Sequence, residues 1–550
     1  MDEQRIRLQT FAFDKSHELR PPSDRIFYSV IFGGIFSIFS ITYPYRDVSV
    51  PTLVLATIGV VGLSALMAAS WLRPQYYWAS IAFSMYIPFS GEYAGDFNRL
   101  LMGMNLTNLM MVPIVFQWLM QRSQLNEPLL RFHAPDLPVL IFVILSSMSV
   151  LRVGIDTGTG SFVEQFIRLK RWLSPFLVYF LFVNMARNER GVRFIVVAIC
   201  TALTAIAMLT MKESYDIGPG GTWDRIRVKG VLGQANATGA FFVYYTLIFL
   251  GFFLCNWRDK RFWLLLIPFL MCGRAMTLAN SRGGLMAFTI AILATFWFRS
   301  KRLFLLGMVG LALAIAFPQY LPETISGRLI YGTFRPASRD EWTPISVREE
   351  QKATTFVEGA RVEKEQNSNK LQDVTKQMDS SSQGRMAIWQ AGYQLFLESP
   401  WFGHGYGTFP KLVGKYNSEL WNRDPHNSYL GIAAEMGVFA LVAFVLSVLL
   451  ILKSCLHVYR YARDEFMRSL GLASVGMCMG LISANFFGSR LDTVELTAYF
   501  WIISALVVQY DTELRAQLLA IARRGPRLVV DPWAVGEEEE EEEEELGENF

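Results

Sequence analysis

The chain has few charges and few cysteines for its length. Of its 550 residues 18% are charged and 52% are hydrophobic, and only five are cysteine. The long polar stretch 318–425 holds none of these cysteines. Neither a disulfide framework nor a cysteine zinc site is therefore expected in that stretch. The cysteines lie in apolar runs or directly after them: Cys200, Cys255, Cys272, Cys455 and Cys478.

Other patterns that the sequence lacks exclude further classes. The apolar runs do not alternate with polar residues as the strands of a membrane barrel do. No internal repeat of the kind found in inverted-repeat transporters is visible. No small-residue cleavage site follows the first apolar block, so the basic leader 5–25 is expected to stay attached and the first helix to serve as an anchor.

Long apolar blocks dominate the rest of the sequence. A helix needs roughly 17 to 25 apolar residues to cross a hydrocarbon core, and the blocks reach or approach that length. The sequence therefore predicts an all-α polytopic membrane protein with about 12 to 14 transmembrane helices. The expected spans are 26–43, 51–71, 76–89, 106–120, 136–151, 172–185, 192–211, 237–256, 262–279, 285–298, 303–317, 431–452, 467–487 and 494–510.

Lysine and arginine set the expected orientation. With the N-terminus in the cytoplasm, about twenty basic residues fall inside and about a dozen in the short outer loops, as the positive-inside bias requires. The resulting segments are a cytoplasmic leader (1–25), an N-terminal bundle (26–317), a large periplasmic loop (318–430), C-terminal helices (431–510) and a cytoplasmic tail (511–550). The tail 511–550 is expected to be acidic and disordered, and its glutamate run, 537–545, to be solvated.

The large loop has three parts. Residues 337–383 are too polar to bury a core and are expected to be mobile or loosely helical. Apolar residues recur at helical spacing over 386–396, which favours an amphipathic helix on the membrane surface, or equally a stripe that packs within the loop. The glycines of 400–409 permit tight turns, and the aromatic residues there could cover a sugar face.

Basic residues gather in the outer turns, against the positive-inside bias. Arg282 precedes two glycines that would let a phosphate reach its guanidinium and the first amides of the next helix. Arg225, Arg227 and Lys229 precede another span, and Arg490 lies in a short turn. An anionic ligand such as a lipid phosphate would explain these charges, although headgroup anchoring explains a third cluster, 168–171, about as well.

His426 ends the loop directly before a span. Its ordinary pKa lies near neutrality, so it could accept a proton from an attacking hydroxyl. A lone loop histidine is more often structural, and that interpretation stays open. Glu435, nine residues on, could orient or neutralise nearby cations if the span continues as helix.

Taken in order, these motifs resemble one family. They are Arg227 with Gly230 and Asn236; Ser281-Arg282-Gly283-Gly284; Gly384-Arg385 with Trp389; Pro400-Trp401-Phe402-Gly403-His404-Gly405-Tyr406-Gly407; and His426-Asn427-Ser428-Tyr429-Leu430 with Glu435-Met436-Gly437. Residues 225–439 thereby resemble the O-antigen ligase/polymerase superfamily (Wzy-C domain). The extra N-terminal spans, the polar insertion and the long tail depart from its pattern and leave the acceptor open.

The resemblance implies a metal-independent glycosyltransferase without a cofactor, in the bacterial inner membrane, with its active site facing the periplasm. The donor would be a glycan on undecaprenyl diphosphate, and the acceptor a hydroxyl of a glycan, a lipid A core or a protein. Membrane lipids would be partners and nucleic acid would not. Catalytic roles are expected for Arg227, Arg282 and His426. Substrate-binding roles are expected for Arg225, Lys229, Asn236, Arg385, His404, Asn427, Tyr429, Glu435 and Arg490.

Two other classes compete with this one. A flippase or exporter of lipid-linked oligosaccharide should place ionisable groups near the bilayer midplane, whereas this sequence concentrates them at one surface. A metal-dependent polyprenyl-phosphate-sugar transferase would need acidic residues in its first outer loop, where 43–50 offers only Asp47. Ligase and polymerase share their motifs, so the sequence does not separate them.

Overall fold

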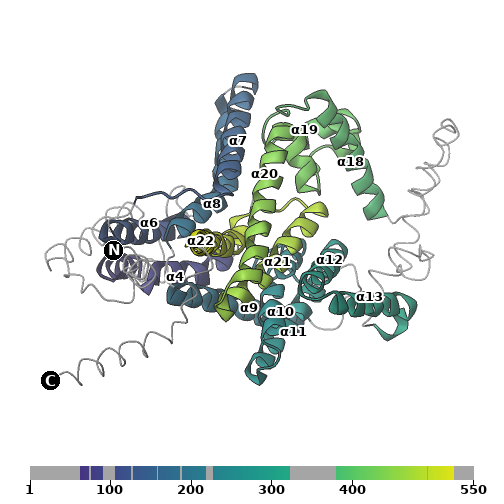
Figure 1. Cartoon of the computed structure of the whole chain (residues 1–550). Helices are drawn as coiled ribbons and strands as arrows, with labels where there is room; N and C mark the ends of the chain where they lie inside the picture. The colour runs from purple at the N-terminus through teal and green to yellow at the C-terminus, as the bar shows by residue number, and fades with distance from the viewer. Residues whose placement is uncertain are drawn as a thin grey trace, which may run out of the picture.

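The structure, a computed structural model, describes residues 62–73, 76–90, 106–125, 128–157, 159–185, 189–217, 227–321, 380–491 and 493–524. The predicted leader and first span, Asp47, Arg225, most of the polar insertion and the glutamate run lie outside these ranges. The described residues form helices joined by turns (Figure 1).

The helices follow the predicted spans closely. In chain order they are α4 (Trp78–Tyr86), η2 (Ile87–Phe89), α6 (Leu106–Leu125), α7 (Asp136–Thr157), α8 (Thr159–Met185), α9 (Glu189–Ile217), α10 (Ala235–Cys255), η4 (Lys260–Leu265), α11 (Leu266–Leu278), α12 (Arg282–Arg299), α13 (Lys301–Ala316), η5 (Pro318–Tyr320), α18 (Ser380–Glu398), α19 (Phe409–Leu412), η8 (Val413–Lys415), η9 (Ser418–Leu420), α20 (Ser428–Tyr461), α21 (Glu465–Phe486) and α22 (Val494–Arg524). Within the described residues, six helical stretches are long and apolar enough to cross a membrane. The predicted all-α polytopic membrane fold is confirmed.

Two helices extend well beyond their predicted spans. α8 begins at Thr159, and α22 continues past Tyr510 to Arg524. The first charged residue after the apolar run of α22, Asp511, is buried and accepts hydrogen bonds from His457 Nδ1 (2.6 Å) and Arg515 Nε (2.9 Å). Because these bonds compensate its charge, the helix does not have to end where the apolar run ends. The first part of the predicted disordered tail is therefore helical.

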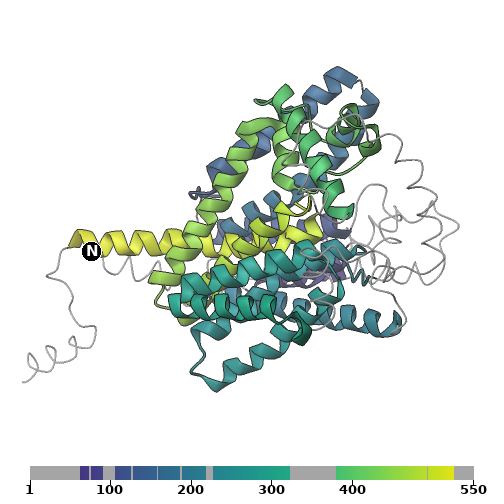
Figure 2. The same ribbon diagram turned by 90° about the vertical axis from the view of Figure 1, so that its right-hand side faces the viewer.

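α10 and α21 form the centre of the bundle, and 83% of the apolar stretch of each helix is buried. α10 is apolar on all sides, as expected for a helix surrounded by others. Small residues let the two backbones approach closely, because a Cβ on Gly251 would lie 2.5 Å from Ala473 Cα and one on Gly480 would lie 2.7 Å from Val243 O. α12, α20 and α22 pack around this pair (Figure 2).

α20 is broken near its start. Gly437 has φ 85° and ψ 176°, so the helical hydrogen bonds are interrupted there. The glycine-rich segment 400–405 supplies replacements: Ala434 O accepts from His404 N (2.9 Å), and Val438 N donates to Pro400 O (2.8 Å). A Cβ at Gly437 would lie 2.1 Å from Trp401 O, so only glycine fits. The segment that could have covered a sugar is thus docked on a helix backbone.

α18 packs within the loop. Its buried residues Ile388 and Leu395 contact Phe409, Val413 and Leu420 from the short helices that follow. α18, α19 and the start of α20 accordingly lie side by side (Figure 1). Of the two interpretations of the 386–396 stripe, the structure supports packing within the loop rather than a face laid on the membrane. We call this layer of α18, α19 and the start of α20 the cap.

The close approach of α10 and α21 predicts a matched pair of glycine variants. Gly251→Val should lower the unfolding free energy by about 1 to 3 kcal/mol, because the added atoms meet backbone that cannot move aside. Gly310→Val on α13 is the control, since a Cβ there meets nothing within 4 Å. Thermal unfolding of the detergent-solubilised protein measures both. Equal melting temperatures for the two variants would contradict the packing described here.

Candidate active site

His426 stands where the cap meets the bundle. Asn427 caps α20, with Oδ1 accepting from Tyr429 N (3.0 Å) and Leu430 N (3.1 Å). His426 itself has φ 50°, a left-handed conformation that costs a non-glycine residue about 1 to 3 kcal/mol and clusters at functional sites. The turn leaves 41% of its side chain exposed. The fold therefore holds the imidazole at the surface at an energetic cost.

Charged residues surround His426. Its backbone N donates to Asp424 Oδ2 (3.3 Å), and its Nδ1 lies 3.6 Å from the same oxygen. Burial lowers the pKa of His426; Asp424 raises it, and Arg385, Arg490 and Arg423 lower it further. The net shift is downward, so the imidazole is neutral at pH 7.

Arg490 lies on the turn between α21 and α22 and reaches the same group of charges. Burial is the main cause of its lowered pKa; Tyr244 and Asp424 oppose the shift, and Arg385 adds to it. A Cβ on Gly488 would lie 2.6 Å from Arg490 Cζ, so this glycine makes room for the guanidinium. Arg490 N donates to Ser428 Oγ (3.3 Å), which ties the turn to the start of α20.

Arg227 faces the junction of α11 and α12. Its Nη2 donates to Asn236 Oδ1 (2.6 Å) and to Ala279 O (3.0 Å), three residues before Arg282. Glu213 at the end of α9 holds the Arg227 segment by accepting from Lys229 N (2.9 Å) and Gly230 N (2.8 Å). The structure thus brings Arg227 next to Asn236 and to the segment just before Arg282.

Arg282 is the first residue of α12, whose N-cap Ser281 accepts from Gly284 N (3.3 Å). The next residue, Gly283, lies against the end of α21: a Cβ there would be 2.8 Å from Phe487 Cβ. Phe487 directly precedes the turn that carries Arg490. The starts of α10, α12 and α20 and the end of α21 therefore meet at one end of the bundle, which we call the site end.

Several predicted site residues take other positions. His404 Nε2 is 2.8 Å from Leu395 O, ten residues and about 15 Å along α18 from Arg385. Glu435 Oε1 accepts from Phe409 N (2.9 Å), so this carboxylate holds the glycine-rich segment. Tyr429 OH donates to Ile482 O (2.9 Å) on α21. These three side chains bond to backbone groups because broken helices and tight turns leave such groups unpaired.

Asn427 and Lys229, two further predicted substrate-binding residues, differ in how they contact the rest of the protein. Asn427 uses its side-chain oxygen to cap α20, while Lys229 is exposed and joins Glu213 through its backbone. Sequence reasoning missed Arg423 and Asp424 as neighbours of His426, although both precede it directly. It also missed Glu213, for which the sequence offers no signal because its partners lie sixteen and seventeen residues away.

Fold and site end together define a multi-pass membrane protein with a cluster of arginines beside a histidine. The family model described as O-antigen ligase matches residues 266–445, which include Arg282, Arg385 and His426. This match supports the predicted resemblance to the O-antigen ligase/polymerase family over that region. Arg227 and Arg490 lie outside the matched range. No curated protein matches the chain.

The cap of α20 predicts a graded effect of substitutions at Asn427. Asn427→Ala removes the acceptor of two amide hydrogens and should cost about 1 kcal/mol of stability, whereas Asn427→Ser retains a capping oxygen and should cost a few tenths. Thermal unfolding in detergent ranks the two variants. If the serine variant is the less stable of the pair, the side chain does not act as a cap.

Proposed function

We propose that the protein transfers a glycan from a polyprenyl-diphosphate donor to an acceptor hydroxyl at the periplasmic face of the inner membrane. The observation that carries the proposal is the position of Arg385 and Arg490 within electrostatic reach of His426, with the Arg227 and Arg282 segments joined to them through Gly283 and Phe487. The family match supports glycan transfer in general.

The arginines fit the donor side of such a reaction. Negative charge grows on a diphosphate as the sugar leaves, and guanidinium groups bind phosphate oxygens in two-pronged geometry. We assign this role to Arg227 and Arg282, with Arg490 as a further contact. Because fixed cations stabilise the leaving group, the reaction requires neither a general acid nor a metal ion.

His426 fits the acceptor side. As a neutral imidazole it can take the proton of the acceptor hydroxyl. The hydroxyl oxygen then bonds to the anomeric carbon, the bond from that carbon to the diphosphate oxygen breaks, and its electron pair leaves with the polyprenyl diphosphate. Nδ1 faces Asp424, so we assign Nε2 to the hydroxyl proton. A single displacement of this kind inverts the anomeric centre.

Purified variants test the assignment. Arg282→Ala should lower turnover by about 10² to 10³ because one transition-state contact is lost. His426→Ala should lower it by about 10² to 10⁴ because the base is lost. Arg258→Ala, an exposed arginine in the turn between α10 and η4, and His404→Gln are the matched controls. The readout is transfer of a labelled glycan from a lipid-diphosphate donor.

Near-normal turnover in a well-folded Arg282→Ala would refute the arginine clamp. Liposomes separate the exporter alternative, since movement of the lipid-linked glycan without formation of a new glycosidic bond would favour export.

The charges around His426 predict opposite shifts in pH dependence. A base must be unprotonated, so activity should fall as the pH drops through the pKa of His426, which lies below its ordinary value. Asp424→Asn removes the carboxylate that raises this pKa and should move the acid limb to lower pH. Arg423→Gln removes a cation that lowers it and should move the limb to higher pH. Profiles of kcat/KM against pH, which report ionisations of the free enzyme, measure both, and shifts in the same direction would contradict the assignment.

A further inference from the structure

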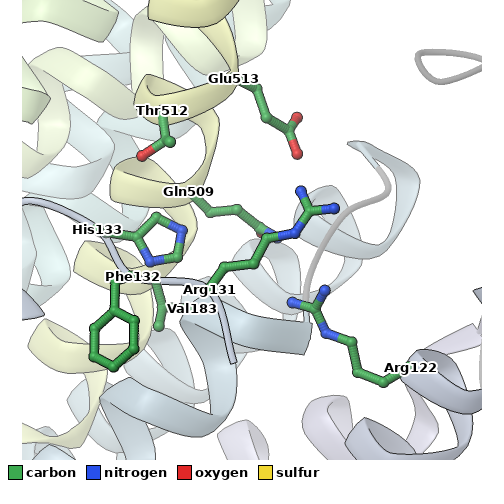
Figure 3. A pocket seen from close by; sticks show the side chains of 8 residues that line it. All are labelled: Arg122, Arg131, Phe132, His133, Val183, Gln509, Thr512 and Glu513. Atoms are coloured by element: carbon green, nitrogen blue, oxygen red, sulfur yellow. The ribbon is translucent and has the colours of Figure 1, made fainter. Parts of the chain in front are cut away.

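A pocket that contains two arginines lies far from the candidate active site. It has a volume of about 290 Å³ and opens between the end of α6, the segment 131–133, the end of α8 and the C-terminal part of α22 (Figure 3). Its α22 residues are Gln509, Thr512 and Glu513. α22 begins at Val494, next to the Arg490 turn, and these residues lie about 22 to 28 Å further along at helical rise. That distance approaches the hydrocarbon thickness of about 30 Å, so the pocket is at the opposite membrane surface.

Two arginines from different segments point into this pocket, Arg122 from α6 and Arg131 from the following connection (Figure 3). Arg122 is only 2% exposed, and its Nη2 donates to Asn184 O. Asn184 Oδ1 in turn accepts from Arg131 N (2.8 Å). Asn184 thus holds both segments that carry the arginines, so the arginine side of the pocket is fixed by hydrogen bonds within the bundle.

The two acidic residues near the arginines differ in burial and in their contacts. Asp136 is buried and is engaged by His133 Nδ1 (3.1 Å) and by Tyr179 OH (2.8 Å). Glu513 lines the outer part of the pocket and is exposed, on the side of the Arg131 guanidinium (Figure 3). The residues that line the pocket carry two guanidinium groups and one carboxylate, so the lining has an excess of positive charge.

An exposed apolar stretch adjoins the pocket, and we call it the rim. Phe132 lines the pocket and is 74% exposed, and Leu129 and Leu130, just before Arg131 in the chain, are 52% and 53% exposed. Trp118 Nε1 donates to Leu129 O (3.2 Å) and holds this segment against α6. At the end of a membrane helix such side chains lie at headgroup level, where aromatic residues gather. The pocket therefore opens toward lipid.

We propose that this pocket binds the headgroup phosphate of an anionic phospholipid, with Arg122 and Arg131 on the phosphate and Leu129, Leu130 and Phe132 against the upper acyl chains. Basic pockets between membrane helices recognise acidic headgroups in this way. The rim distinguishes a lipid from a free anion, because a free phosphate gains nothing from apolar contacts.

Native mass spectrometry of the full-length protein tests the proposal, with phosphatidylglycerol and phosphatidylcholine as probes and inorganic phosphate as competitor. Arg131→Gln should weaken phosphatidylglycerol binding about fivefold, and Glu513→Gln should strengthen it by a similar factor. Leu130→Asn should also weaken it. Arg463→Gln, an exposed arginine at the same end of the bundle, is the control and should leave binding unchanged.

Two results would overturn the proposal: equal phosphatidylglycerol affinity in the wild type and Arg131→Gln, or displacement of the lipid by millimolar phosphate with Leu130→Asn behaving as wild type. The second result would identify a site for a free anion. Glycan transfer by Arg131→Gln should remain at the wild-type level, so this test is separate from that of the proposed function.

Discussion

The contact between Gly283 and Phe487 connects the start of α12, which carries Arg282, with the turn that carries Arg490. α12 begins one residue before this contact and α21 ends one residue before it. A Cβ on residue 283 would lie 2.8 Å from Phe487 Cβ, so a larger residue would push the helix ends apart. Arg282 stands on one side and the Arg490 turn on the other. The distance between Arg282 and the Arg490 turn therefore depends on residue 283 being a glycine more than on a bond between the two arginines.

Gathering arginines in this way has an electrostatic cost. Arg385 lowers the pKa of both His426 and Arg490, which records repulsion among like charges, while Asp424 acts in the opposite direction on both. A bound diphosphate would turn this repulsion into attraction. A site of this kind is stabilised by its ligand, and charge that accumulates on the ligand during reaction strengthens that stabilisation.

Sequence reasoning was accurate for the positions of the helices. The length of each apolar run predicts a helix, because lipid imposes a minimum span whatever the packing. It failed where helices continue past the apolar run, as at Asp511, since hydropathy cannot show that a buried carboxylate has partners. It also misplaced His404 and Glu435. Both residues bond to backbone groups that are left unpaired by the break at Gly437 and the adjoining turns, and neither break nor docking is visible before the chain folds.

The motifs around Arg282, Arg385 and His426 stand out in the sequence for a different reason. Each of these residues lies beside a glycine or a capping residue, and such local patterns can be recognised from the sequence alone. Arg490 has the same kind of position. Glu213, by contrast, acts through a segment distant in sequence and could not be recognised.

The site is built from two parts with separate cores. Arg385 belongs to the cap and His426 adjoins it; the cap packs on its own cluster of Ile388, Leu395 and Phe409. Arg227, Arg282 and Arg490 belong to the ends of the bundle helices. Trp389 joins the parts, donating from Nε1 to Pro425 O (3.1 Å) and lying 5.6 Å from the ring of Phe486. If the bundle binds the donor and the cap orients the acceptor, cap residues can change with the acceptor while the diphosphate site keeps its geometry. This division accounts for how one reaction could serve either a ligase or a polymerase.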